Sequence, residues 1–160
     1  MSTRKLTLAA IFASLTCVAT IYLCIPATYG YINLGDTIIL IGSLFLGPTY
    51  SMLSAGIGSV LADVVLGYLS YAPATLIIKC TMGFLASFMI HKFRKKIPVV
   101  LLSYALAELI MIVFYTIYDA ILYGKSVIIT TLPGNTTQGV INLVVAFIFF
   151  MIIRKNKIFR

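Results

Sequence analysis

The sequence contains few charged residues, and this scarcity excludes most soluble folds. Only 10% of its 160 residues are charged, whereas 61% are hydrophobic and the mean hydropathy is +1.09. Soluble globular domains are about a quarter charged and about half apolar, because a domain of this size cannot bury more apolar surface. The composition therefore predicts an integral membrane protein with no room for a sizeable soluble domain.

Motifs for catalysis, nucleotide binding and metal binding are also absent. The sequence has no Walker lysine loop, HExxH motif, CxxC pair or Gly-x-Ser-x-Gly motif. Its three cysteines, Cys17, Cys24 and Cys80, lie in apolar runs, and we expect them to be small buried residues. We therefore expect no metal, no cofactor bound by this chain and no enzymatic activity. Any ATP-driven function would need ATPase partners.

The hydrophobic segments predict an all-α membrane protein with one transmembrane domain over residues 1–160. A membrane-spanning helix needs about 20 apolar residues. The first run follows Arg4 and Lys5 as in a signal peptide, but no small-x-small cleavage site follows it, so we expect it to be retained as a helix. The six expected spans lie at about residues 6–25, 36–47, 49–66, 72–90, 98–122 and 134–153.

The basic residues predict the orientation of these spans. The net charge of +8 is not evidence for nucleic-acid binding, because the basic residues lie at segment ends rather than on one amphipathic face. The positive-inside rule then places both termini and the loop after the fourth span in the cytoplasm. Ten of the twelve Lys and Arg residues fall there: Arg4, Lys5, Lys92, Arg94, Lys95, Lys96, Arg154, Lys155, Lys157 and Arg160.

Ionisable residues inside the expected membrane segments are candidates for function, because their burial in lipid is costly. The stretch 31–83 is apolar but interrupted by Gly and Pro, as segments beside a transported molecule often are. It contains Asp36, Asp63 and Lys79. We expect Asp36 to cap the second helix. We expect Lys79 to pair with Asp63 or Asp119, which would not exclude a ligand contact.

With this orientation, polar residues from several spans fall in one layer beneath the outer loops. Such a layer suits a small, flat molecule with polar edges, which the loop tyrosines Tyr29, Tyr31, Tyr68 and Tyr71 could cover. Glu108 is deeper, and we expect it to act in packing or coupling. The expected layer consists of Asp63, Lys79, Tyr115, Asp119, Asn135, Gln138 and Asn142.

Small residues share one face of the first span. Ala9, Ala13, Thr16 and Thr20 follow at i, i+4, i+7 and i+11, and small faces let helices approach closely in lipid. The spacing allows two interpretations: packing within this molecule, or docking of another membrane subunit.

Three strings of the sequence resemble the substrate-binding S component of energy-coupling factor (ECF) vitamin transporters. The resemblance extends over nearly the whole chain. It is greatest to a branch that carries riboflavin-type labels and is similar to proteins assigned to hydroxymethylpyrimidine and pyridoxine uptake. The strings are YINLGDTIILIGSLFLGP at 31–48, GIGSVLADVVLGYLSYAPATLIIKCTMG at 56–83 and LPGNTTQG at 132–139.

This resemblance implies a multi-pass protein of the bacterial cell membrane that binds one vitamin on its outer side. It implies docking on an EcfT-like transmembrane coupling subunit, which carries two cytoplasmic ATPases that use the ATP. The AxxxA docking motif of the family matches Ala9 and Ala13. The binding site of the family uses the first outer loop and the outer halves of spans four to six, which match Tyr31, Asn33, Lys79, Tyr115, Asn135, Gln138 and Asn142.

Several alternatives stay open from the sequence. The leading ligands are a vitamin B6 form, pyridoxine or pyridoxamine, and hydroxymethylpyrimidine. Riboflavin is second, because its three rings need a larger cavity. Lys79 is expected to meet the phenol-like oxygen of a B6 ring. A stand-alone proton-coupled carrier could instead use Asp63, Lys79, Glu108 and Asp119 as a relay, and a membrane-embedded enzyme is the third hypothesis.

Overall fold

The computed structural model describes residues 3–93 and 95–156, and it is mostly helical, as the sequence predicts. An antiparallel hairpin of strands β1 (Cys24–Pro26) and β2 (Tyr31–Asn33) lies between the first two helices, and a short 3-10 turn, η1 (Lys125–Val127), precedes the last. The helices are α1 (Thr3–Tyr22), α2 (Gly35–Phe45), α3 (Pro48–Leu66), α4 (Ala72–Lys92), α5 (Ile97–Tyr123) and α6 (Ile128–Lys155).

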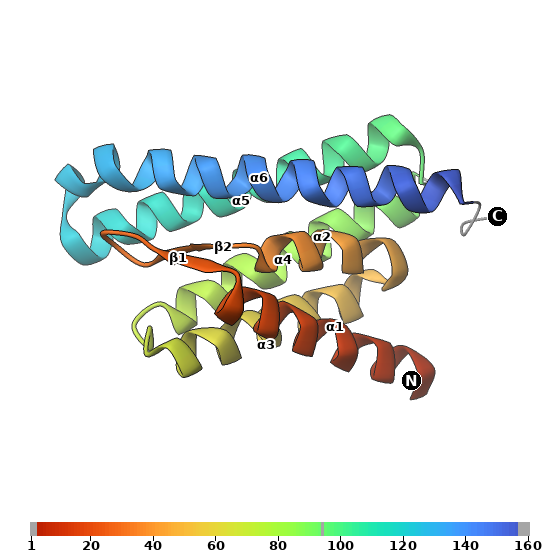
Figure 1. Ribbon diagram of the computed structural model, residues 1–160, viewed down its shortest axis with the longest axis horizontal. Helices are drawn as coiled ribbons and strands as arrows, with labels where there is room; N and C mark the ends of the chain where they lie inside the picture. Colours follow the sequence, from red (N-terminus) through yellow and green to blue (C-terminus); the bar gives the residue numbers. More distant parts are fainter. Residues whose placement is uncertain (1–2, 94, 157–160) are drawn as a thin grey trace.

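Helix α2 is too short to cross a membrane alone. Its 11 residues extend about 16 Å at about 1.5 Å per residue, against a hydrocarbon core of about 30 Å. Strand β2 leads directly into α2, so that hairpin and helix together follow the length of the molecule (Figure 1). Within the described residues, five helical segments are long and apolar enough to span: α1, α3, α4, α5 and η1 with α6.

The molecule has two chemically different ends. Helix α1 begins, α6 ends and α4 connects to α5 at one end, on the right of Figure 1, which we call the basic end. The hairpin, the α3–α4 turn and η1 lie at the opposite end, which we call the hairpin end. This arrangement matches the predicted alternation of spans. The basic end carries Arg4, Lys5, Lys92, Lys95, Lys96, Arg154 and Lys155.

The small face of α1 packs within this molecule. Ala9 is 6% exposed, and Ala13 is half-buried. A Cβ atom on Gly58 of α3 would lie 2.4 Å from the carbonyl oxygen of Ala13, so only glycine allows this approach of the two backbones. The packing interpretation therefore accounts for the burial of this face, and a docking role for Ala9 and Ala13 stays a prediction.

Two boundaries differ from those predicted. Helix α6 begins at Ile128 rather than at residue 134, and Pro133 lies inside it. Gly and Pro are tolerated inside membrane helices, because neighbouring groups form hydrogen bonds with the backbone N–H and C=O groups that lose their helical partners. Helix α1 ends at Tyr22 rather than at residue 25, and the hairpin takes up the end of the first expected span and part of the interval before the second. Its strands are too short to leave an alternating pattern, and its turn depends on Gly30, whose φ of 70° suits glycine.

The half of the interior nearer the basic end is apolar. It is filled by the buried side chains of Leu40, Leu44, Met82, Tyr104 and Phe150, which come from α2, α4, α5 and α6. The other half, beneath the hairpin, contains most of the buried polar and charged groups. The fold therefore gathers most of the buried polar groups at the hairpin end, while Glu108 of α5 is a buried acid outside that region.

Candidate functional site

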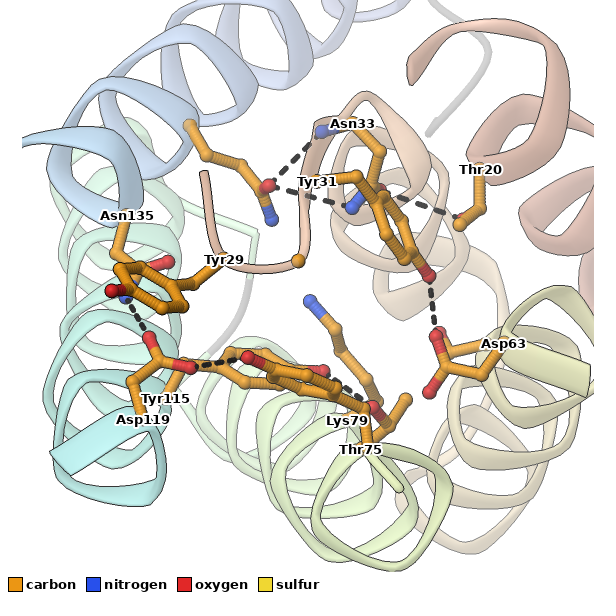
Figure 2. A pocket seen from close by; sticks show the side chains of 14 residues that line it. Thr20, Tyr29, Tyr31, Asn33, Asp63, Thr75, Lys79, Tyr115, Asp119 and Asn135 are labelled. Carbon is orange, nitrogen blue, oxygen red and sulfur yellow. Dashed lines mark hydrogen bonds between the residues drawn. The ribbon is translucent and has the colours of Figure 1, made fainter. Parts of the chain in front are cut away.

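A cavity lies beneath the hairpin, enclosed by side chains from α3, α4, α5 and α6 (Figure 2). It holds about 490 Å³ of space between atoms, including the part open to solvent. Small-molecule sites combine aromatic or apolar walls with a few polar groups, and the lining of this cavity contains both. The lining residues are Thr20, Tyr29, Gly30, Tyr31, Asn33, Ser59, Asp63, Tyr71, Thr75, Lys79, Tyr115, Asp119, Asn135 and Gln138.

The structure brings most of the predicted site residues to this one cavity. Those that line it are Tyr31, Asn33, Asp63, Tyr71, Lys79, Tyr115, Asp119, Asn135 and Gln138. The exception is Asn142, which is fully buried one turn deeper on α6 and does not line the cavity. The predicted layer therefore exists as a geometric arrangement of side chains from separate segments of the chain.

At the floor of the cavity, Lys79 of α4 forms a buried ion pair with Asp36 of α2, which does not itself line the cavity. The Lys79 ammonium donates to Asp36 Oδ1 at 2.5 Å, and the Gln138 amide donates to Asp36 Oδ2 at 2.8 Å. Lys79 also lies 5.1 Å from the ring centroid of Tyr115. The prediction that Lys79 pairs with Asp63 or Asp119 is wrong. The capping role predicted for Asp36 is also wrong, because Leu34 is the N-cap of α2 and Asp36 lies in the first turn.

Two amides of α6 support this floor from below. Gln138 Oε1 accepts from the Asn33 backbone N–H at 3.0 Å. Asn142 Oδ1 accepts from the backbone N–H of Thr37 at 2.8 Å and from its hydroxyl at 2.7 Å. Asn142 Nδ2 donates to the carbonyls of Asn33 and Gln138 at 2.8 and 2.9 Å. Asn142 therefore fixes the junction of β2 and α2, while Gln138 both supports and lines the site.

One wall is formed by Asp63 of α3 with Tyr31 of the hairpin. The Tyr31 hydroxyl donates to Asp63 Oδ1. Burial, reinforced by the nearby Asp63 charge, raises the pKa of Tyr31 above its usual range. Raising the pKa of a phenol favours its protonated form. Tyr31 therefore keeps its proton, and its hydrogen bond, throughout the neutral range.

The opposite wall is formed by Asp119 of α5 (Figure 2). The Tyr71 hydroxyl donates to Asp119 Oδ1 at 2.8 Å, and Asn135 Nδ2 donates to Asp119 Oδ2 at 3.5 Å and to the Thr116 hydroxyl at 3.1 Å. Between the walls, the Tyr115 hydroxyl donates to Thr75 at 2.9 Å. The walls thus offer carboxylate, amide and hydroxyl groups alongside tyrosine rings.

Tyrosines cover the cavity at the hairpin end. The ring centroids of Tyr29 and Tyr123 are 4.8 Å apart, and those of Tyr31 and Tyr68 are 4.9 Å apart. The Tyr68 hydroxyl donates to the Gly30 carbonyl at 3.4 Å. Aromatic contacts of this kind hold the hairpin tip against the α3–α4 turn and the end of α5. The expectation that loop tyrosines close over the site agrees with this geometry.

Four lining residues are absent from the prediction, namely Thr20, Gly30, Ser59 and Thr75, and Tyr29 is predicted only as a covering side chain. Three of them lie on helical faces that the sequence does mark. Thr20 continues the small face of α1, Ser59 precedes Asp63 by four residues, and Thr75 precedes Lys79 by four. Helical spacing of this kind would have found them. Gly30 matters through its backbone, which no side-chain pattern reveals.

Glu108 lies outside the cavity, in the apolar half of α5. Its side chain is 2% exposed, and neither carboxyl oxygen has a hydrogen-bond partner. This position agrees with the prediction that Glu108 lies deeper than the layer of polar residues beneath the outer loops. Among the described residues, no three His, Cys, Asp or Glu side chains are grouped so that they could hold a metal ion.

Comparison with known proteins places the chain in a family. Residues 1–155 match the family model described as the S component of the ECF-type riboflavin transporter. The thiamine precursor transporter HmpT of Lactococcus lactis subsp. cremoris (strain MG1363) is 28% identical over 158 residues, covering 97% of this chain and 90% of HmpT. An uncharacterized protein in a gap 3' region of Pyrococcus woesei is 32% identical over 121 residues, covering 76% of this chain and 80% of that protein.

Solved structures confirm the predicted fold. The S component of a bacterial ECF transporter superposes with a TM-score of 0.75 at 16% identity, over 100% of both chains. The S component for biotin from an ECF-type ABC transporter superposes with a TM-score of 0.72 at 18% identity, over 98% of this chain and 94% of that one. The chain therefore belongs to the riboflavin-type family of ECF transporter S components, multi-pass proteins of the cell membrane that bind substrate for a transporter powered by separate ATPase subunits, and it is not an enzyme.

Proposed function

We propose that this S component binds a single-ring vitamin or vitamin precursor in the cavity beneath the hairpin. The leading ligands are hydroxymethylpyrimidine and the vitamin B6 forms pyridoxine and pyridoxamine. The observation that carries the proposal is the lining: tyrosine rings for the faces of a flat molecule, and carboxylate, amide and hydroxyl groups for its edge. The likeness to a thiamine precursor transporter over 97% of the chain supports the pyrimidine.

Riboflavin is the alternative within the family. Its three fused rings and polyol chain would have to fit beneath the same tyrosine contacts, Tyr29 with Tyr123 and Tyr31 with Tyr68. A single ring requires less space and can bring its polar edge close to both Asp63 and Asp119. The cavity volume of about 490 Å³ includes solvent-open space, which further favours the smaller ligand.

The binding experiment is a titration of the purified protein in mild detergent with each of these compounds. We expect sub-micromolar affinity for at least one single-ring ligand and much weaker binding of riboflavin. Tighter binding of riboflavin than of every single-ring ligand would contradict the proposal. Uptake into vesicles should require the coupling subunit and the ATPases, whereas uptake by this chain alone under a pH gradient would favour a proton-coupled carrier.

We further propose how the chain is oriented in the membrane and where the coupling subunit docks. The basic end faces the cytoplasm, so that the cavity opens to the outside. The coupling subunit then docks beside α1 near Ala9 and Ala13. Because Ala9 is already buried within the chain, Ala13 is the position where a contact with a partner is best tested.

Ala13→Leu is expected to lower ATP-driven uptake by about tenfold while purified protein binds its ligand as tightly as the parent. The larger side chain would separate two closely packed helices in lipid, where small residues allow close approach. Ala10→Leu, on the exposed side of α1, is the matched control and should transport normally. If Ala13→Leu loses ligand binding together with uptake, the face serves internal packing, and the docking proposal is wrong.

A further inference from the structure

We propose that Asp63 determines specificity by accepting a hydrogen bond from a nitrogen donor of the ligand. The preferred ligand would then be a single-ring heterocycle that presents an amino or ammonium group to Asp63, rather than its oxygen analogue. This inference rests on the proposed function and specifies the substrate class of the same cavity.

The first support is an unfilled acceptor on the cavity wall. Asp63 is only 2% exposed and lines the cavity. Its Oδ1 accepts from the Tyr31 hydroxyl, but its Oδ2 has no hydrogen-bond partner. A buried carboxylate oxygen without a donor is costly, and a ligand donor would remove that cost.

The second support is that the other ionisable groups around the cavity already have partners. Asp36 accepts from Lys79 and Gln138, one donor on each oxygen. Asp119 accepts from Tyr71 on one oxygen and from Asn135 on the other. The ammonium of Lys79 pairs with Asp36 rather than with Asp63. Among the described carboxylates that line the cavity, Asp63 is therefore the one with an oxygen free for a ligand.

The chemistry of a carboxylate decides which ligand group it prefers. Both oxygens accept and neither donates, so a ring substituent with N–H groups is favoured over a carbonyl oxygen. An ammonium group gains further from the opposite charge, because charge-assisted hydrogen bonds are about twice as strong as neutral ones. Sites that hydrogen-bond a particular ligand group discriminate strongly against analogues that lack it. Asp63 should thus separate amino ligands from their oxygen counterparts.

The test compares matched ligand pairs on the purified full-length protein by calorimetric titration. The pairs are hydroxymethylpyrimidine against its 4-oxo analogue, and pyridoxamine against pyridoxine. The parent should bind the nitrogen member of at least one pair about tenfold more tightly. Asp63→Asn keeps an oxygen for Tyr31 but places an N–H₂ group where Oδ2 was, so it should abolish or reverse that preference. Asp119→Asn, the same change on the opposite wall, should weaken both members of each pair by the same factor and so leave their ratio unaltered.

The outcomes separate the two proposals. If single-ring ligands bind but the parent shows no nitrogen preference, or if Asp63→Asn retains it, the role of Asp63 is refuted and the proposed function stands. If no single-ring ligand binds the parent, both are refuted. Thermal unfolding without ligand checks the fold: Asp63→Asn should be at least as stable as the parent, because it removes a buried charge whose Oδ2 has no partner.

Discussion

Lys79→Met is expected to lower the free energy of unfolding by about 3–5 kcal/mol, because it leaves the Asp36 charge buried without its cation. Lys79 is 3% exposed, and Asp36 is fully buried. Gln138 would remain as a donor to Asp36, but a neutral amide does not compensate a carboxylate charge in an apolar interior. The measurement is thermal or denaturant unfolding of the purified protein in detergent.

The matched control is the double variant Asp36→Asn with Lys79→Met. It removes both charges, and the amide oxygen introduced at position 36 can still accept from Gln138, so most of the lost stability should return. A double variant as unstable as Lys79→Met would contradict the pairing. This coupling also limits what Lys79 variants reveal about ligands. A single Lys79 variant would bind pyridoxine more weakly simply because Asp36 is left unpaired. The predicted contact of Lys79 with a B6 ring is therefore tested in the double variant, which lacks the ammonium but leaves no unpaired charge.

Asn142→Leu is expected to cost about 2–4 kcal/mol of stability and to abolish ligand binding as a consequence, because it leaves buried backbone groups at the β2–α2 junction without partners. It removes four hydrogen bonds, to the Thr37 backbone and hydroxyl and to the carbonyls of Asn33 and Gln138. Each buried group left unpaired costs about 1–3 kcal/mol. Unfolding and ligand titration are the two measurements.

Asn135→Leu is the matched control, because the same substitution falls on the same face of α6, two turns nearer the hairpin end. Asn135 is only half-buried, and its hydrogen bonds to Thr116 and Asp119 are longer, at 3.1 and 3.5 Å. We expect Asn135→Leu to change stability little and to weaken ligand binding about tenfold. If both variants lose stability equally, the division of α6 amides into supporting and lining residues is wrong.

The sequence predicts which residues share a helix face better than it predicts which side chains bond to one another. Asn135, Gln138 and Asn142 follow one helical stripe, and α6 presents all three towards the protein interior. The same logic places Asp63, Lys79 and Asp119 at similar depths, and all three line the cavity. Periodicity and charge at the segment ends suffice for this, because the depth of a residue in a membrane helix follows from about 1.5 Å per residue.

Pairing could not be predicted, because it depends on the depth in the molecule at which α2 begins. The hairpin carries the chain down beneath the outer loops before α2 starts, and this brings Asp36 beside Lys79 of α4 and Gln138 of α6. Its strands contain three residues each, too few for a period-two pattern. Asp36 therefore resembles a helix cap in sequence, although its carboxylate pairs with Lys79 beneath the cavity. Asn142 lies one turn deeper on α6 than Gln138 and does not line the cavity.

The most direct test of the central claim is mass spectrometry of the small molecule retained by gently purified protein. We expect a single-ring heterocycle carrying an amino group, in about equimolar amount, and we expect clearly less of it in Asn135→Leu purified in the same way. Retention of riboflavin by the parent, or equal retention of the same molecule by the parent and Asn135→Leu, would contradict the assignment of the cavity beneath the hairpin.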